Sequence, residues 1–169
     1  MRLFVAAQPP DDVLDALVEV VVDLRRRPDA ESLRWVTREQ LHVTLRFLGE
    51  VADVAPVLEA LAATRLPAAE AEATPGVTRL GRQVLCVPVA GVDALAAAIT
   101  HIGPDEDRPF RGHLTLARAR GRRGVVARSL AGTPVDLHWP VPEVALVRSH
   151  LGPDGPRYET LATFPTHHP

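Results

Sequence analysis

Apolar residues repeat along the first half of the chain at two spacings, which predict strands and helices in alternation. Residues 2–7 form an apolar run that is typical of a short strand. Residues 11–27 carry apolar side chains at helical spacing, at Val13, Leu14, Leu17, Val20, Val21 and Leu24. Acidic residues at the start of this segment and arginines at its end match the dipole of a helix. We therefore expect a strand followed by an amphipathic helix.

Two further strands and a second helix are predicted next. Residues 33–36 indicate a short strand, residues 41–48 a longer one that ends at Gly49, and the alanine-rich segment 53–64 a helix. Polarity alternates along residues 41–48, where the sequence places His42, Thr44 and Arg46 between Val43, Leu45 and Phe47. Because successive side chains of a strand point to opposite faces, this strand should have one apolar and one reactive face.

The second half of the chain repeats this order of elements loosely. Its pattern predicts a hairpin over residues 77–80 and 83–89, a short helix over residues 92–101 and a strand over residues 113–119. A short helix and three strands should complete the chain, over residues 125–130, 135–139, 144–151 and 157–164. Short strands with helices inserted in both halves favour an α+β fold with antiparallel sheets.

Length and composition limit the architecture to one unit. A chain of 169 residues with 46% hydrophobic residues suits a single domain, whether compact or bilobal, and argues against two independent domains. No apolar run reaches the roughly 18 residues that a membrane-spanning helix needs. Acidic residues also follow the first apolar run too soon for a signal peptide. We therefore expect a soluble, cytoplasmic protein.

The single cysteine, Cys86, lies inside the apolar run 84–89. A lone cysteine forms no intramolecular disulfide, and free cysteine is among the residue types that are most often buried. We therefore interpret Cys86 as a small core residue and not as a nucleophile.

The charge of the chain argues against broad binding of nucleic acid. Its net charge is −2, which excludes the strongly basic surface of a protein that coats a duplex. All 19 basic residues are arginine, and lysine and asparagine are absent, a bias that fits a GC-rich coding background. The number of arginines is therefore no guide to function, and any contact with nucleic acid should be local.

Two short motifs, His42-x-Thr44 and His113-x-Thr115, lie in predicted strands of the two halves. Side chains two residues apart on a strand share a face, so each motif presents an imidazole beside a hydroxyl. If the two halves pack as equivalent lobes, both imidazoles and both hydroxyls converge across one cleft. That convergence is a prediction about the tertiary structure.

This set of side chains suits phosphoryl transfer without a metal ion. A neutral imidazole takes a proton from water, while an imidazolium gives one to the leaving oxygen. Threonine hydroxyls donate hydrogen bonds to phosphate oxygens, and Arg118, five residues after His113, adds a bidentate cation. The motifs offer too few ligands for a metal centre, so we expect no metal and no cofactor. A strained cyclic phosphodiester fits such a site.

Each motif taken alone also has a structural explanation. A single His-x-Thr in a strand is common, and the alternative is a half-buried histidine whose ring nitrogens are satisfied by hydrogen bonds. Two copies in matching contexts, one in each half of the chain, favour the functional interpretation.

The other histidines are interpreted as structural or surface residues. His101 follows a predicted helix, where a contact with the helix dipole explains it. His138 and His150 lie in predicted strands without a paired threonine, and the His167-His168 pair lies in a tail that should fray.

A run of arginines follows the second motif. Both a contact with an RNA backbone at the mouth of the cleft and a solvated turn are compatible with this run, which comprises Arg118, Arg120, Arg122 and Arg123. The motif itself favours a functional role for Arg118.

The segments HVTLRFLGE, which begins at His42, and RPFRGHLTLAR, which ends at Arg118, resemble the paired signatures of the 2H phosphoesterase superfamily. They are most similar to the RNA 2',3'-cyclic phosphodiesterases of bacteria and archaea, which were first described as 2'-5' RNA ligases. The similarity extends to RLFVAA near the start and to SHLGPDGPRYETLATFP near the end, and so covers nearly the whole chain. It implies one bilobal, pseudo-twofold α+β domain over residues 1–169, with two antiparallel sheets flanking a central cleft and helices outside.

The resemblance also implies an activity, which is hydrolysis of RNA 2',3'-cyclic phosphate ends to 2'-phosphates. His42 and His113 take the family's catalytic positions, and Thr44, Thr115 and Arg118 take its substrate-binding positions. His113 is then the base that activates water, and His42 is the acid that protonates the 3' oxygen. Gly112 stands where relatives often carry proline, which affects the loop that enters the strand.

Two other functions remain open at this point. One is a binding module for RNA ends or nucleotides without turnover, although binding alone does not call for two groups that titrate near neutrality. The other is reversible 2'-5' RNA ligation, for which the equilibrium in dilute water is unfavourable. The expected partners are RNA ends or cyclic nucleotides, and we expect a monomer with no protein partner.

Overall fold

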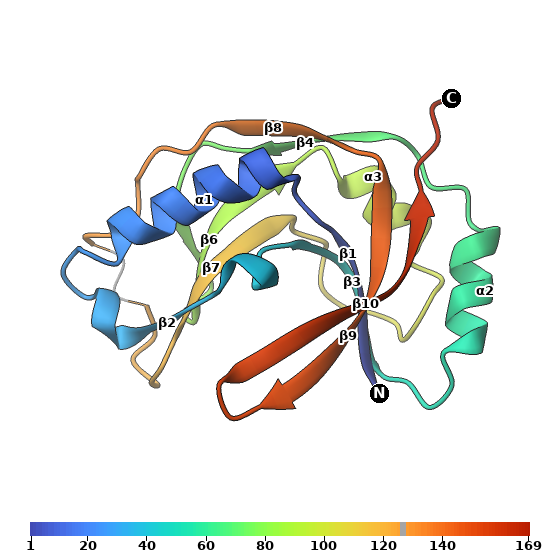
Figure 1. Ribbon diagram of the computed structural model, residues 1–169, viewed down its shortest axis with the longest axis horizontal. Helices are drawn as coiled ribbons and strands as arrows, with labels where there is room; N and C mark the ends of the chain where they lie inside the picture. Colours follow the sequence, from blue (N-terminus) through green and yellow to red (C-terminus); the bar gives the residue numbers. More distant parts are fainter. Residues whose placement is uncertain (126–127) are drawn as a thin grey trace.

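A computed structural model describes residues 1–125 and 128–169 of the chain as a strongly curved antiparallel sheet with helices around it (Figure 1). The helices are α1 (Asp11–Leu24), α2 (Ala55–Ala63) and α3 (Asp93–Ala98), with short 3-10 turns at Ala30–Ser32 and Arg38–Gln40. The strands are β1 (Arg2–Ala7), β2 (Leu33–Trp35), β3 (Val43–Glu50), β4 (Ala69–Ala73), β5 (Thr78–Leu80), β6 (Val84–Ala90), β7 (His113–Ala119), β8 (Leu137–Val141), β9 (Glu143–Gly152) and β10 (Gly155–Pro165).

The strands fall into two groups that meet at β3 and β7. One group has the order β10-β9-β1-β3, and the other has the order β7-β6-β4-β8, with β2 beside β7 and β5 beside β6. Strands β3 and β7 share one register pair among the described residues, which is Val43 with Leu114. The α+β fold with two flanking groups of antiparallel strands is therefore confirmed, and the two groups form one continuous sheet.

The helices pack against the apolar face of the sheet, and together they bury the main core. The amphipathic helix α1 buries Val13, Leu17, Val21 and Leu24. It contacts β8 of the second strand group, while α3, from the second half of the chain, contacts β3 of the first. Each strand group is thus covered in part by a helix from the other half, which ties the halves together.

Several predicted elements differ from the observed ones. The helix expected over residues 92–101 is limited to α3, and the strand expected over residues 135–139 is observed as β8, two residues later. Strand β4 was not predicted, because its sequence AEAEA has strong helix formers, although buried Ala71 and Ala73 alternate there with exposed Glu70 and Glu72.

The short helix expected over residues 125–130 includes residues 126–127, which lie outside the described residues. Residues 128–130 form turns and not a helix. The tail expected to fray is held in place, because His167 bridges to Pro67 and its backbone N–H donates to the Leu66 carbonyl at 2.8 Å. In the part of the chain that the structure describes, no helix has the length and apolar character needed to cross a bilayer.

Candidate active site

A cleft of about 490 Å³ lies where the two strand groups meet. Its walls come from β1, β3 and β7, and from the β9–β10 hairpin, whose far end projects from the body of the molecule (Figure 1). All five residues singled out by the sequence line this cleft: His42, Thr44, His113, Thr115 and Arg118. The predicted convergence of the two motifs is therefore observed.

The pairing of β3 with β7 explains why the motifs converge. Val43 and Leu114, the register partners, are the residues between histidine and threonine in the two motifs. Both are fully buried on the core side. Because side chains alternate along a strand, the flanking histidines and threonines all point to the opposite side, into the cleft.

A bulge in β7 directs Arg118 into the same cleft. Thr115 pairs with Cys86 and Ala117 pairs with Leu85, so Leu116 is an extra residue in the ladder. An offset of five residues from His113 would place Arg118 on the core face of a regular strand. The extra residue reverses the alternation after Thr115, and Arg118 is exposed in the cleft.

A matching bulge in β3 corrects the prediction for Arg46. Ala6 pairs with Thr44 and Val5 pairs with Arg46, which leaves Leu45 as the extra residue. Arg46 was expected beside His42 and Thr44 on the reactive face, but it is 5% exposed on the core side. Phe47, expected on the apolar face, lines the cleft instead and is 53% exposed. Phe47 and Arg118 thus occupy equivalent positions, each five residues after the histidine of its motif.

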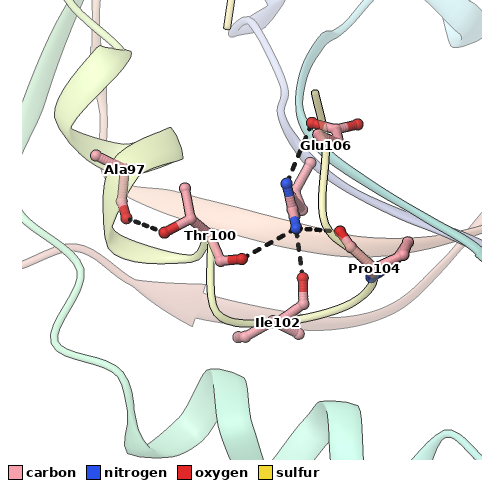
Figure 2. Close-up of polar contacts among 6 residues, drawn as sticks. Ala97, Thr100, Ile102, Pro104 and Glu106 are labelled. Carbon is pink, nitrogen blue, oxygen red and sulfur yellow. Dashed lines mark hydrogen bonds and ion pairs between the residues drawn. The ribbon is translucent and has the colours of Figure 1, made fainter. Parts of the chain in front are cut away.

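Buried Arg46 holds the segment that leads to the second motif. Figure 2 shows the carbonyl oxygens of Thr100, Ile102 and Pro104 together with the carboxylate of Glu106 around its guanidinium. The donor–acceptor distances are 3.0 Å to Ile102, 3.0 Å to Thr100 and 3.2 Å to Glu106. A charge buried in this way is stable only when it is fully hydrogen-bonded, so these contacts fix the course of residues 100–106.

His42 is packed among aromatic rings. Its imidazole stacks on Phe4 at a centroid distance of 4.9 Å and meets the edge of Tyr158 at 5.2 Å. Its Nδ1–H donates to the Gln40 carbonyl at 2.7 Å, and its Nε2 lies 2.9 Å from the Thr44 hydroxyl. Because a carbonyl only accepts, the neutral ring carries its proton on Nδ1, and its Nε2 lone pair accepts from the Thr44 hydroxyl in the cleft.

The environment of His42 disfavours its charged form. Burial lowers the pKa of His42 to about 4, and Coulomb repulsion from the protonated form of His113 and from Arg118 acts in the same direction. The hydrogen bond to Gln40 opposes this shift but does not cancel it. In the free protein at neutral pH, His42 is therefore a neutral imidazole.

His113 has a similar backbone anchor in a more open position. Its Nδ1–H donates to the Arg111 carbonyl at 2.7 Å, which again leaves Nε2 as the nitrogen that faces the cleft. In both motifs the carbonyl that accepts from Nδ1 belongs to the residue two positions before the histidine. The two imidazoles are thus oriented by the same kind of hydrogen bond to the local backbone.

Sequence reasoning missed other residues that line the cleft, among them Arg2, Phe4, Phe47 and Tyr158. Phe4 and Tyr158 belong to a second apolar cluster with Ala6, Ala145 and Val147, which forms the floor beneath His42. In the sequence they occur as ordinary alternating residues of strands. Only the pairing of β1 with β3 and β9 shows which face of β1 lies in the cleft.

The remaining histidines, the cysteine and one of the later arginines make contacts of the kind that structural residues make. His138 lies 2.7 Å from Asp136, His150 lies 2.7 Å from Glu159, and the His101 ring contacts the Thr64 hydroxyl. Cys86 is buried, which raises the pKa of its thiol to about 11 and agrees with a core residue. Of the arginines that follow Arg118, Arg120 donates to the Leu33 carbonyl at 3.2 Å.

No group of three or more histidine, cysteine or acidic side chains gathers at one point within residues 1–125 and 128–169. The cleft itself is lined by imidazole, hydroxyl, guanidinium and aromatic groups. These groups are suited to binding an anion and to moving protons.

Residues 8–75 match the family model described as LigT like Phosphoesterase. Over 97% of its length the chain is 35% identical to a Thermus thermophilus protein named RNA 2',3'-cyclic phosphodiesterase, 89% of which is covered. The chain belongs to the LigT-like phosphoesterase family. The family match contains His42 and Thr44, and the relative's match extends over the second motif.

Solved structures agree with this membership. A crystal structure of a Thermus thermophilus protein superimposes with a TM-score of 0.76 at 32% identity, covering 98% of this chain and 97% of that one. Escherichia coli LigT complexed with 3'-AMP has a TM-score of 0.75 at 25% identity, with the same coverage. The chain is thus a phosphoesterase, a hydrolase with the fold that the resemblance of the motifs implied.

Proposed function

We propose that this phosphoesterase hydrolyses 2',3'-cyclic phosphates at RNA ends to 2'-phosphates without a metal ion. The observation that carries the proposal is the convergence of both His-x-Thr motifs and Arg118 on one cleft. The name of the Thermus thermophilus relative, RNA 2',3'-cyclic phosphodiesterase, supports the same substrate class. The neutral and anion-binding groups of the cleft provide proton transfer and charge stabilisation without further components.

The reaction needs one base and one acid on opposite sides of the phosphate. We assign His113 as the base, whose Nε2 takes a proton from the attacking water as the new P–O bond forms. The bond between phosphorus and the 3' oxygen breaks, and His42 gives a proton to that oxygen. The product then keeps its phosphate on the 2' oxygen. This division of roles follows the resemblance to the family.

The remaining groups stabilise the charge that develops on the phosphate. The hydroxyls of Thr44 and Thr115 lie on the cleft face beside the two histidines. Protonation of His42 frees the Thr44 hydroxyl from its bond to Nε2, so both hydroxyls can then donate to the non-bridging oxygens. Arg118 brings a bidentate cation to the same oxygens. Because these donors are fixed by strands, little reorganisation is needed as the transition state forms.

In this scheme His42 takes up its proton from solvent when the substrate anion binds. Burial keeps His42 neutral in the free enzyme, with a pKa of about 4. A phosphate anion next to the ring favours the imidazolium and raises the pKa. Binding of the cyclic phosphate therefore favours the protonated form of His42, which is the form that acts as the acid.

The test is incubation of the enzyme with a nucleoside 2',3'-cyclic phosphate in excess EDTA, followed by chromatography of the products. We expect turnover to be unaffected by EDTA and the 2'-phosphate to accumulate. Loss of turnover in EDTA that a divalent ion restores would contradict the metal-free mechanism. Accumulation of the 3'-phosphate would reverse the proposed orientation of the cyclic phosphate.

A further inference from the structure

Arg2 lies in the cleft, one row of side chains beyond His42 and its stacking partner Phe4. Strand pairing places Tyr158, Ser149 and Arg2 side by side across β10, β9 and β1. Partners in an antiparallel ladder point to the same face, and all three residues line the cleft. Arg2 therefore extends the reactive face of the sheet away from the two motifs.

The cleft that Arg2 enters has no acidic lining in the described part of the chain. Its charged or titratable members are Arg2, His42, His113, Arg118 and Tyr158. Glu50, the register partner of Arg2 on β3, does not line the cleft, and its carboxylate lies 3.3 Å from the α-ammonium of Met1. Although the chain as a whole has a net charge of −2, this cavity is positive.

Two arginines approach the cleft from different strand groups. Arg118 comes from β7, and Arg2 comes from β1. Burial raises the pKa of the Tyr158 hydroxyl, and the guanidinium groups of Arg118 and Arg2 partly oppose that rise, which agrees with their positions near the phenol. Within the described residues, Arg2 makes no side-chain hydrogen bond or ion pair, so its donors face the cleft without a protein partner.

The catalytic scheme uses only one of these arginines. Arg118 lies on the same strand as His113 and Thr115 and serves the reacting phosphate. The Cα atom of Arg2 lies about 7 Å along β1 from that of Phe4, from the rise of two strand residues. Phe4 stacks on His42, so Arg2 lies one row of side chains beyond the imidazole that contacts the reacting phosphate. A guanidinium there is outside the reacting group but inside the same cleft, which suits it to a second phosphate of the same substrate.

We propose that Arg2, with the Ser149 hydroxyl beside it, binds the phosphate on the 5' side of the terminal nucleotide. The inference rests on the proposed function, because it presupposes that the cyclic phosphate lies between His42 and His113. It makes RNA strands and 5'-phosphorylated nucleotides the preferred substrate class over nucleosides that carry only the cyclic phosphate. A guanidinium provides two donors for one phosphate, and the adjacent hydroxyl provides a third.

The test compares adenosine 2',3'-cyclic phosphate with its 5'-phosphorylated form, which share the base, the ribose and the reacting group. We expect the wild-type enzyme to favour the 5'-phosphorylated form by roughly 10- to 100-fold in kcat/KM, the usual worth of hydrogen bonds between charged groups. Arg2→Gln should bring this ratio close to one, and Arg2→Lys should restore part of it. Arg157→Gln is the matched control, since exposed Arg157 adjoins Tyr158 in sequence but does not line the cleft.

The outcomes separate this inference from the proposed function. A wild-type ratio near one, or a ratio that Arg2→Gln leaves unchanged, overturns the role of Arg2 while turnover itself stands. If neither substrate is turned over, the proposed function fails, and calorimetry then tests Arg2 with adenosine 2'-phosphate and its 5'-phosphorylated form. A preference for the latter that Arg2→Gln removes supports the second phosphate site, and equal affinities contradict it.

Discussion

Val43 and Leu114 are register partners at the point where the two strand groups meet, and each lies between the histidine and the threonine of its motif. This pair relates the two motifs by an approximate twofold axis. The same relation continues into the two bulges, at Leu45 in β3 and at Leu116 in β7. The geometry of the cleft therefore depends on the register of two strands and not on a loop.

Removal of either imidazole should abolish most of the activity. We expect His42→Ala and His113→Ala each to lower kcat on a 2',3'-cyclic nucleotide by roughly two to four orders of magnitude, the range for a lost general acid or base. His138→Ala is the control, because exposed His138 pairs with Asp136 far from the motifs in sequence. A variant at either motif that keeps near-native turnover shows that its histidine takes no part in proton transfer.

A substrate with a good leaving group separates the acid from the base. A nitrophenyl phosphodiester needs no protonation of its leaving oxygen, so His42→Ala should retain much of its wild-type rate on this substrate. His113→Ala should remain inactive, because water still has to be deprotonated. Release of nitrophenol, followed by absorbance, gives both rates. The reverse pattern would exchange the two roles and leave the two-histidine mechanism intact.

Acid should destabilise the free protein through His42. The pKa of His42 is about 4 in the folded protein and roughly 6.5 in an unfolded chain. Between these values the unfolded state binds more protons, so the free energy of unfolding falls as the pH falls from about 6.5 to about 4. His42 then accounts for a loss of roughly 2 kcal/mol at most between pH 7 and pH 5.

Urea denaturation at pH 7 and pH 5 measures this loss. In His42→Asn, which has an amide in place of the imidazole, the difference between the two pH values should shrink by most of that amount. A difference that stays the same in the variant assigns the acid sensitivity to other groups.

Arg46 should be needed for the stability of the segment before the second motif. Arg46→Met leaves the carbonyl groups of Thr100, Ile102 and Pro104 without their shared donor, and we expect the free energy of unfolding to fall by roughly 3 to 5 kcal/mol. Glu106→Gln keeps those three bonds and removes one charge that is partly exposed, so it should cost about 1 kcal/mol or less. Equal losses in the two variants would contradict a role for the carbonyl contacts.

The sequence by itself determined the local elements and the chemistry of the motifs. Alternation of polarity identified the two His-x-Thr strands, because a strand has a fixed side-chain period of two. Helical spacing identified α1 because an α-helix also has a fixed side-chain period. The apolar face that this spacing indicated is the face that α1 buries. The residues of the two motifs also indicated a phosphoesterase family, and the comparison with relatives confirmed that family.

Only the tertiary structure decided how those strands are paired and what else enters the cleft. A bulge is defined by the pairing of two strands, so the pattern of one strand cannot reveal it. The sequence therefore did not show that Phe47 and not Arg46 lines the cleft, or that Arg118 lies on the cleft face. Arg2 and Tyr158 lie far apart along the chain and meet across β9. Local spacing specifies which face a residue shares with its neighbours, whereas the partner strand determines what that face encloses.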